Sequence, residues 1–198
     1  MSTSEIGFAI LGTGMIAQYH AQAIAQTHGA RLVAVSQADP TRATEAAARF
    51  GVPCETSYEA LLARDDVDAV CICTPSGLHA AQAIAAAQAG KHVLVEKPMA
   101  LTLADADTLI ATCHASGVVL GVALQRRTDP VFQSVRQAIA AGELGRLTLG
   151  AASVPYWRPQ SYYDSRAWRG TWALDGGGAL MNQGIHLVDL LLWYMGDV

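Results

Sequence analysis

The stretch that decides the fold is GFAILGTGMIA, residues 7–17. Its first five residues form an apolar run that predicts a buried strand, and a helical pattern begins at Met15. Between them, Gly12, Gly14 and Ala17 match the pattern G-x-G-x-x-A. The first glycine permits a tight turn, the second lets the backbone approach a phosphate, and the alanine keeps helix and strand close. A strand, turn and helix in this order predict a dinucleotide site at the helix N-terminus. The residues expected to contact the pyrophosphate are Gly12, Thr13, Gly14, Met15 and Ile16.

The same alternation of apolar runs and helical patterns continues to residue 122 and indicates a parallel sheet wrapped by helices. The predicted strands are Gly7–Leu11, Arg31–Val35, Ala69–Cys73, His92–Val95 and Val118–Val122. The predicted helices are Met15–Thr27, Thr41–Phe50, Ser57–Ala63, Leu78–Gln88 and Leu103–Ala115. This order predicts an α/β fold in which residues 1–124 form a Rossmann-type, doubly wound domain.

The pattern changes after residue 124, and residues 125–198 are predicted to begin a second, α+β domain. It would contain a helix at Val131–Ala141, a strand at Leu147–Val154 and a helix at Ala179–Tyr194. One strand cannot make a sheet, because both of its edges stay unpaired. We therefore expect the missing strands to lie in sequence beyond Val198 or in another chain, and we interpret the chain as a fragment.

Composition excludes several classes of protein. The 198 residues are 52% hydrophobic and 15% charged, which is a globular composition, and the formal net charge of −4 does not favour nucleic acid as a partner. No apolar run reaches membrane-spanning length, and the N-terminus shows no signal peptide, so we expect a cytoplasmic protein that does not bind membranes. The four cysteines show no C-x-x-C pattern and no histidine at ligand spacing, which predicts buried, reduced thiols and no metal site.

Three further segments fall at the carboxyl ends of predicted strands, where ligands bind in such sheets. Gln37 follows the second strand at the position that contacts the adenosine ribose. It is neither the acidic residue that suits NAD nor an arginine that would accept a 2′-phosphate, so NADP stays possible while NAD is favoured. The residues expected to line the cofactor from the next loop are Thr74, Pro75 and His79. For His79 a structural or cofactor-contacting role early in its helix is favoured, with contact to the substrate as the alternative.

Lys97 ends the fourth long strand in the run Glu96-Lys97-Pro98. Proline restricts the residue before it, which fixes where the lysine points. A lysine at this edge can lower the pKa of a substrate hydroxyl and stabilise the alkoxide formed as hydride leaves. Glu96 is expected to orient it. A surface lysine at a strand end is the alternative.

The last predicted helix carries a polar stripe. Asn182, His186 and Asp189 fall at i, i+4 and i+7, directly after the glycine run at 176–178. A histidine can transfer protons near neutrality, and Asp189 could hold its tautomer. The stripe therefore indicates a functional site, with a structural core histidine as the alternative.

Aromatic and arginine side chains are dense between Tyr156 and Trp172. Aromatic faces with arginine hydrogen bonds suit a sugar or polyol, but the same residues could pack a domain interface. The sequence leaves both readings open.

Taken together, these motifs resemble the Gfo/Idh/MocA oxidoreductases, a family that includes glucose–fructose oxidoreductase and inositol dehydrogenases. The resemblance spans the chain and rests on the segments Gly12–His20, Thr74–His79, Gly90–Pro98, Gln125–Arg127, Gly142–Gly145 and Gly176–Asp189. It implies a Rossmann domain that binds NAD or NADP, and a second domain with an open, mainly antiparallel sheet that makes a homo-oligomer, a dimer or tetramer.

The resemblance also implies hydride transfer between nicotinamide and a hydroxyl-bearing carbon of a sugar, sugar derivative or cyclitol. The catalytic residues would be Lys97, His186 and Asn182, and the substrate contacts Lys97, Arg126, Trp168, Asn182 and His186. Glu96 and Lys97 would also contact the cofactor.

The chain departs from the family pattern in three ways. Asn182 stands where many members have aspartate, so it can hold a hydroxyl but cannot act as a base. Gln37 replaces a frequent aspartate, and family members are usually much longer than this chain. A non-catalytic dinucleotide-binding protein, acting as a sensor or subunit, is therefore the alternative function.

Overall fold

The computed structural model describes residues 5–196, which divide into two compact units between Val122 and Ala123.

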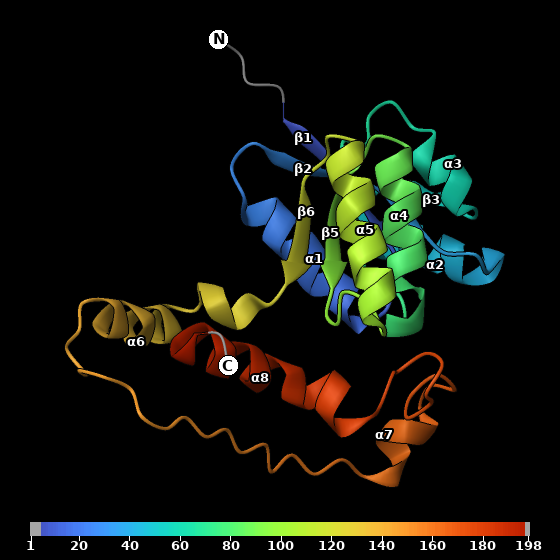
Figure 1. Ribbon diagram of the computed structural model, residues 1–198. Helices are drawn as coiled ribbons and strands as arrows, with labels where there is room; N and C mark the ends of the chain where they lie inside the picture. The colour runs from blue at the N-terminus through green and yellow to red at the C-terminus, as the bar shows by residue number, and fades with distance from the viewer. Residues whose placement is uncertain (1–4, 197–198) are drawn as a thin grey trace. The chain divides into compact units, whose positions relative to one another are not determined.

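The first unit is built on a six-stranded sheet in the order β3-β2-β1-β4-β5-β6. Its strands are β1 (Ile6–Leu11), β2 (Ala30–Ser36), β3 (Cys54–Glu55), β4 (Ala69–Ile72), β5 (His92–Glu96) and β6 (Leu120–Ala123). The pairs β1–β2, β1–β4, β2–β3 and β4–β5 are all parallel. The order reverses between β1 and β4, and in such a sheet the crevice at that reversal is where ligands bind (Figure 1). The predicted Rossmann architecture is confirmed.

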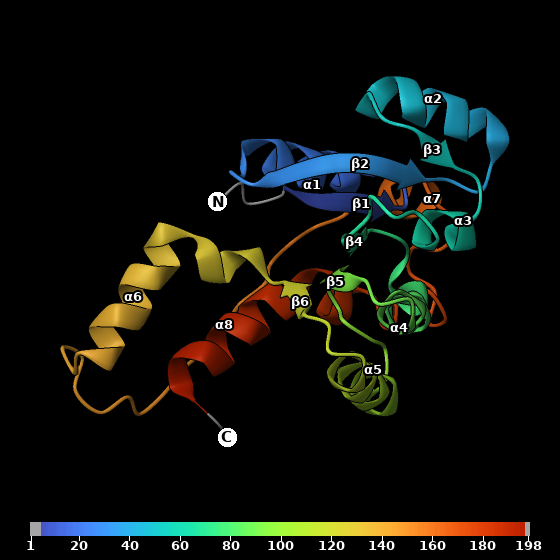
Figure 2. The same ribbon diagram turned by 90° about the horizontal axis from the view of Figure 1, so that it is seen from above.

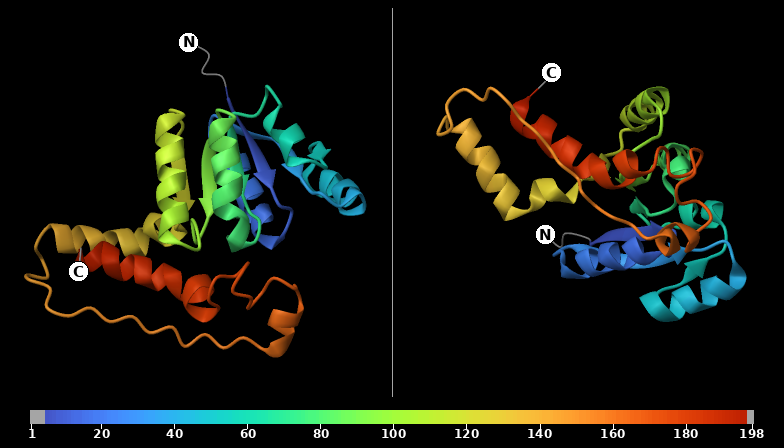
Figure 3. Two further views of the ribbon diagram at one scale, coloured as in Figure 1. Left: turned by 45° about the vertical axis from the view of Figure 1, so that its right-hand side comes forward. Right: turned by 90° about the horizontal axis from the view of Figure 1, so that it is seen from below.

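Helices cover both faces of this sheet. They are α1 (Met15–Gln26), α2 (Pro40–Phe50), α3 (Tyr58–Leu62), α4 (His79–Gln88) and α5 (Leu103–Ala115), with a 3₁₀ turn η1 (Ser76–Leu78) before α4. Figures 2 and 3 show α4 and α5 side by side on one face of the sheet, and Figure 2 shows α1 on the other. Strand residues alternate between two cores: Ala9 and Leu11 pack with α3, α4 and α5, whereas Ile10 packs with α1 and α2. A strand buried on both faces reads as a continuous apolar run, as β1 does.

Local signals set the ends of these helices. Asp39 caps α2, because its carboxylate accepts hydrogen bonds from the backbone N–H groups of Thr41 at 3.0 Å and Arg42 at 3.4 Å. Gly51 ends the same helix at φ 69°, where only glycine is unstrained. The sequence pattern did not predict β3. This strand is two residues long and pairs Cys54 with Val35, so it is too short to produce a periodic pattern.

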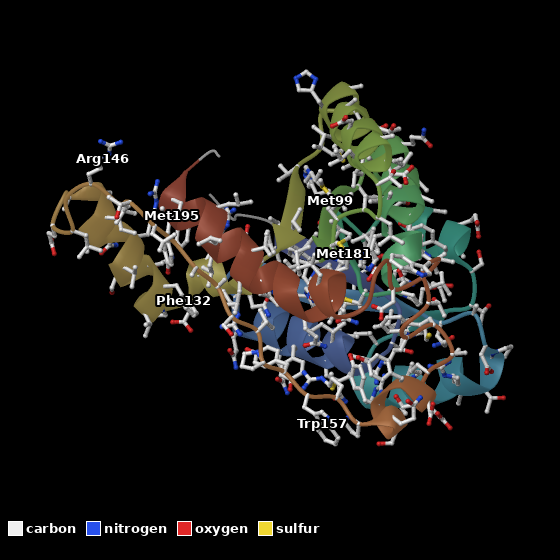
Figure 4. The ribbon with its side chains drawn as sticks, turned by 60° about the horizontal axis from the view of Figure 1, so that its bottom comes forward. Met99, Phe132, Arg146, Trp157, Met181 and Met195 are labelled. Atoms are coloured by element: carbon white, nitrogen blue, oxygen red, sulfur yellow. The ribbon has the colours of Figure 1, made fainter. Side chains whose placement is uncertain are left out.

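The second unit consists of helices and irregular segments. Its helices are η2 (Gln125–Thr128), α6 (Pro130–Ala140), α7 (Gln160–Asp164), η3 (Ala179–Gly184) and α8 (Ile185–Met195). Figures 1 and 3 show α6 beside α8, and the Tyr194 hydroxyl on α8 donates to the Phe132 carbonyl oxygen on α6 at 3.0 Å. The labelled side chains of Phe132 and Met195 mark these two helices in Figure 4.

The predicted strand at Leu147–Val154 is wrong. Residues 147–159 follow an irregular path, and no strand follows β6 within the part of the chain that the structure describes. A strand forms only when its backbone groups pair with a neighbour, and residues 123–196 supply none. The segment passes α8 instead: a Cβ added at Gly150 would lie 2.7 Å from Leu191 and 2.8 Å from Met195.

The predicted single helix at Ala179–Tyr194 is partly wrong. Residues Ala179–Gly184 form a π-helical turn, and the α-helix begins at Ile185. Asn182 therefore lies in the π turn, whereas His186 and Asp189 lie in the α-helix, and their common face stays a prediction. Such turns are rare and occur frequently at functional sites.

Candidate functional site

The turn after β1 is shaped for close approach by a phosphate. Gly12 has φ 90°, and a Cβ at this position would lie 2.8 Å from the Cys73 carbonyl oxygen at the end of β4. Gly14 differs, because a Cβ there would meet nothing within 4 Å. Helix α1 then begins at Met15 without a side-chain cap, so no capping side chain accepts from its first N–H groups. This is the geometry of an anion site at a helix N-terminus.

Two side chains hold the turn from the neighbouring strand and helix. Gln37, after β2, donates from Nε2 to the Thr13 hydroxyl at 2.9 Å, and its Oε1 accepts from the Asp39 N–H at 3.2 Å. Arg49, in the last turn of α2, donates to the Thr13 carbonyl oxygen and lies over the Phe50 ring at 4.6 Å. Thr13 is therefore fixed at both its hydroxyl and its backbone.

His79 lies in the core, 1% exposed, and braces two loops. Its Nδ1 lies 2.7 Å from the Pro98 carbonyl oxygen, and its Nε2 lies 2.9 Å from the Thr74 carbonyl oxygen. Thr74 in turn donates to Gln82 Oε1 at 2.5 Å. The loops after β4 and β5 are thus joined through a buried ring, and the side chain of His79 acts on any ligand through them.

Glu96 connects the end of β5 to helix α1. One carboxylate oxygen lies 2.9 Å from His20 Nε2, and both side chains are 12% exposed. The other oxygen accepts from the Lys97 N–H at 3.2 Å. Glu96 therefore holds the backbone at Lys97, whose side chain is half-buried, and its expected orienting of that side chain stays a prediction.

In the second unit, a buried carboxylate organises the segment around Asn182. Asp175 is 1% exposed and accepts from Asn182 Nδ2 at 2.7 Å and from the Gly170 N–H at 2.8 Å. It thereby fixes which way the Asn182 amide faces. His186 lies in the first turn of α8 and is half-buried.

Asp189 has a different partner from the one suggested by its spacing. Both of its oxygens accept hydrogen bonds from Arg127, at 2.6 Å from Nη2 and 2.9 Å from Nε. This bidentate pair joins η2 to α8 and raises the pKa of Arg127. Asp189 is therefore an ion-pair residue, and its expected hold on the His186 tautomer stays a prediction.

The other predicted substrate residues lie in the second unit, in two places. Arg126 donates to the Tyr156 hydroxyl at 3.4 Å and lies 5.5 Å from the Phe132 ring. Trp168 is half-buried, with the Arg169 guanidinium 5.7 Å from its ring. The predicted catalytic residues divide between the units, with Lys97 in the first and Asn182 and His186 in the second.

The cysteines are free thiols, three of them buried and Cys54 half-buried. Burial raises the pKa of Cys71 to about 12, so it stays a neutral thiol. Within residues 5–196, no group of three or more His, Cys, Asp or Glu side chains is arranged to hold a metal ion. No helix in the same range is long and apolar enough to cross a membrane.

The chain matches two models of known protein families. Residues 6–124 match the family described as "Oxidoreductase family, NAD-binding Rossmann fold", and residues 132–198 match the "GFO/IDH/MocA C-terminal domain". The chain belongs to the Gfo/Idh/MocA oxidoreductase family. The predicted resemblance is confirmed.

Two solved structures and one curated protein illustrate the relationship. The WlbA dehydrogenase from Bordetella pertussis, in complex with NADH and UDP-GlcNAcA, is 41% identical with a TM-score of 0.94 over 100% of this chain and 57% of its own. A levoglucosan dehydrogenase in complex with NADH and levoglucosan is 29% identical, with a TM-score of 0.84 over 98% of this chain and 55% of its own. The inositol 2-dehydrogenase of Rhizobium meliloti is 32% identical over 97% of this chain and 56% of its own length. The chain thus spans a little over half the length of these relatives.

Sequence reasoning missed three residues of this arrangement. Arg49 carries no local signal, because its contact with Thr13 joins the end of α2 to a turn 36 residues earlier. Gln183 was not predicted, because its hydrogen bonds to Arg158 and Tyr162 join segments more than 20 residues apart. Asp175 could have been noticed, since it is an acidic residue directly before three glycines in a segment otherwise poor in acid.

The two glycines of the turn should separate folding from binding. Gly12→Ala should destabilise the protein by about 1–3 kcal/mol, because the residue is strained and meets the Cys73 carbonyl. Gly14→Ala is its matched control and should change stability by less than about 0.5 kcal/mol, yet weaken NADH binding by occupying the phosphate space. Thermal unfolding and NADH fluorescence titration measure the two effects. Equal unfolding midpoints for both variants would contradict the close approach at Gly12.

Removing the buried carboxylate should loosen the second unit. Asp175→Ala leaves the Gly170 N–H and the Asn182 amide without their acceptor, which should cost about 2–4 kcal/mol. Asp164→Ala is the control, since that exposed carboxylate accepts one hydrogen bond, from Gln160. Denaturant unfolding followed by tryptophan fluorescence reports on this unit, because all 4 tryptophans lie in it. Similar losses in both variants would show that Asp175 does not organise the segment.

Proposed function

We propose that the protein is an NAD-dependent dehydrogenase that transfers hydride between nicotinamide and a hydroxyl-bearing carbon of a sugar, sugar derivative or cyclitol. One observation carries this proposal. The open, uncapped helix N-terminus at Gly14 and the strand end at Lys97 both belong to the carboxyl edge of one parallel sheet. That edge is where such sheets bind their ligands.

The residues of the first unit fit a dinucleotide. The space beside Gly14 and the first N–H groups of α1 suit a pyrophosphate, and Gln37 is positioned for the adenosine ribose. A bound nicotinamide would accept or donate the hydride at its C4. The chain's own residues would orient the cofactor and manage the proton of the substrate hydroxyl.

Lys97 is proposed to act on the substrate oxygen. Its ammonium group can donate a hydrogen bond to the hydroxyl and stabilise negative charge on that oxygen as the hydride departs. Glu96 supports this role by holding the Lys97 backbone N–H, and His20 holds Glu96. A non-catalytic binder would need neither constraint.

His186 is proposed to exchange the proton of the hydroxyl, and Asn182 to hold the substrate. The Asn182 amide cannot accept a proton as a base, so proton transfer falls to the histidine or to Lys97. Asp175 supports the role of Asn182 by accepting a hydrogen bond from its amide nitrogen at 2.7 Å, which fixes how the amide is oriented.

The relatives leave the charge of the substrate open. UDP-GlcNAcA in the WlbA complex is an anionic nucleotide sugar, whereas levoglucosan and inositol are neutral. Both kinds of substrate are compatible with dehydrogenation at a carbinol carbon.

The first test is binding and turnover with the full 198-residue chain. We expect saturable quenching or enhancement of NADH fluorescence, tighter than that of NADPH, and NAD reduction with a sugar or cyclitol. Tight binding without turnover on any substrate would favour the non-catalytic alternative.

Replacing the lysine should separate binding from chemistry. Lys97→Met keeps the length of the side chain but removes its charge, and should lower turnover by about a hundredfold while NADH affinity changes little. Lys97→Arg is the charge-retaining control and should keep more of the activity than the methionine variant. Turnover near the wild-type rate in Lys97→Met would remove this residue from the mechanism.

A single carboxylate at the ribose position should sharpen cofactor choice. Gln37→Asp places a negative charge where NADP would carry its 2′-phosphate. The affinity for NADPH should fall at least about tenfold relative to NADH, because like charges repel at close range. Gln88→Asp adds the same charge at an exposed site on α4 and should leave the ratio unchanged. An unchanged ratio in Gln37→Asp would show that Gln37 does not face the ribose.

A further inference from the structure

Two arginines enclose one tyrosine ring in the second unit. The Arg169 guanidinium lies 4.1 Å from the centre of the Tyr162 ring, and the Arg158 guanidinium lies 5.4 Å from it. Arg169 also donates to the Tyr162 carbonyl oxygen at 2.9 Å and to the Ser165 hydroxyl at 2.7 Å. Arg158 donates to Gln183 Oε1 at 3.0 Å. We name Arg158, Tyr162, Arg169 and Gln183 the arginine cluster.

The positive charge of this cluster has no carboxylate partner. The ion pairs found among residues 5–196 involve Arg31, Arg64, Arg127 and His20, and none includes Arg158 or Arg169. Residues 156–172 hold three arginines and one aspartate, a net charge of +2, in a chain whose net charge is −4. This separation of charge concentrates positive potential in one short segment.

Arg169 also keeps a hydrogen-bond donor unused. Its Nε is buried and has no hydrogen-bond partner within the described structure. Both arginines are only half-exposed. A partly desolvated guanidinium without a counter-charge is unfavourable, and an anion that accepts its hydrogen bonds would remove that penalty.

Hydrogen bonds join the cluster to the segment that carries the proposed substrate residues. Gln183 donates from Nε2 to the Tyr162 hydroxyl at 3.2 Å, and it directly follows Asn182 in the π-helical turn. At the other side, Asp175 bonds both Asn182 and the Gly170 N–H next to Arg169. The cluster and Asn182 are therefore held by one network within the second unit.

Exposed aromatic faces lie in the same segment. Trp157 is 78% exposed and Trp172 is 82% exposed, and Figure 4 shows Trp157 on the extended segment that leads into the cluster. Sugar rings and nucleobases both pack on such faces.

We propose that the arginine cluster binds an anionic group, a carboxylate or a phosphate, of the sugar substrate. The inference rests on the proposed function and narrows its substrate class to charged sugars such as sugar acids and nucleotide sugars. Guanidinium groups bind both anions through paired N–H donors, whereas a neutral cyclitol would leave the two charges uncompensated. The Tyr162 ring holds the guanidinium groups of Arg158 and Arg169 in place before the anion binds.

The test is isothermal titration calorimetry of the full chain saturated with NADH. The probes differ in the anions that they carry. UDP-glucuronic acid carries a diphosphate and a carboxylate, and UDP-N-acetylglucosamine carries the diphosphate only. Glucuronic acid carries the carboxylate only, and myo-inositol carries no charge. The variants are Arg158→Gln and Arg169→Gln. The control is Arg146→Gln, an exposed arginine of the same unit, labelled in Figure 4.

We expect the wild type to bind at least one anionic probe more tightly than myo-inositol, with an affinity that falls as salt rises. Each cluster variant should weaken that binding at least about tenfold, the usual size of a lost charge-assisted hydrogen bond, while Arg146→Gln leaves it unchanged. The single-anion probes then tell whether the cluster holds the phosphate or the carboxylate. Arg158→Lys and Arg169→Lys, with tryptophan fluorescence as a folding control, should recover part of the affinity.

Two outcomes would overturn the inference: equal affinity for the anionic probes in Arg158→Gln, Arg169→Gln and Arg146→Gln, or no preference of the wild type for any anionic probe. NADH affinity is measured on the same samples and depends on the first unit. NADH binding and sugar-dependent turnover that persist without anion preference would leave the proposed function standing. Absence of NADH binding in the wild type would contradict the proposed function, and titration of the same probes without NADH would then test the cluster by itself.

Discussion

The close approach of two strand ends, where only glycine fits, is the constraint on which the first unit depends. Gly12 brings the end of β1 against the Cys73 carbonyl at the end of β4. That contact sets the turn, which begins α1 and leaves its N-terminus open at Gly14. It also places the Thr74 loop beside the turn, and His79 then ties this loop to Pro98. The edge proposed to bind the dinucleotide follows from packing of backbone on backbone.

In each unit a largely buried carboxylate organises polar groups through its two oxygens. Glu96 divides its oxygens between His20 and the Lys97 N–H, and Asp175 divides its oxygens between Asn182 and Gly170. In both cases the carboxylate fixes a neighbour with a proposed contact to the ligand. Because a buried carboxylate is costly without its donors, each arrangement resists rotation of the group it holds. Preorganisation of this kind is what hydride transfer at a defined carbon requires.

Local patterns predicted the first unit well and the second unit poorly. The strands and helices through residue 122 are short, regular and consistent with their neighbours in the sheet, so period and caps suffice. The strand expected at Leu147–Val154 had the right composition but no partner among the described residues. The π turn at Ala179–Gly184 was hidden too, since glycine-rich sequence does not distinguish a widened turn from an α-helical one.

The sequence by itself determined the strands and helices of the first unit and the glycine turn after β1, because hydrophobic period and turn residues depend on neighbours a few positions away. The alternation of these elements then indicated the doubly wound sheet. Tertiary structure alone decided the partners of the polar side chains. Asp189 pairs with Arg127, 62 residues earlier, and Arg49 reaches Thr13 across 36 residues. Charge pairing is long-ranged in sequence and short-ranged in space, so no spacing rule reveals it. Arg158 and Arg169 became informative only in the structure, because none of the ion pairs among the described residues includes either of them.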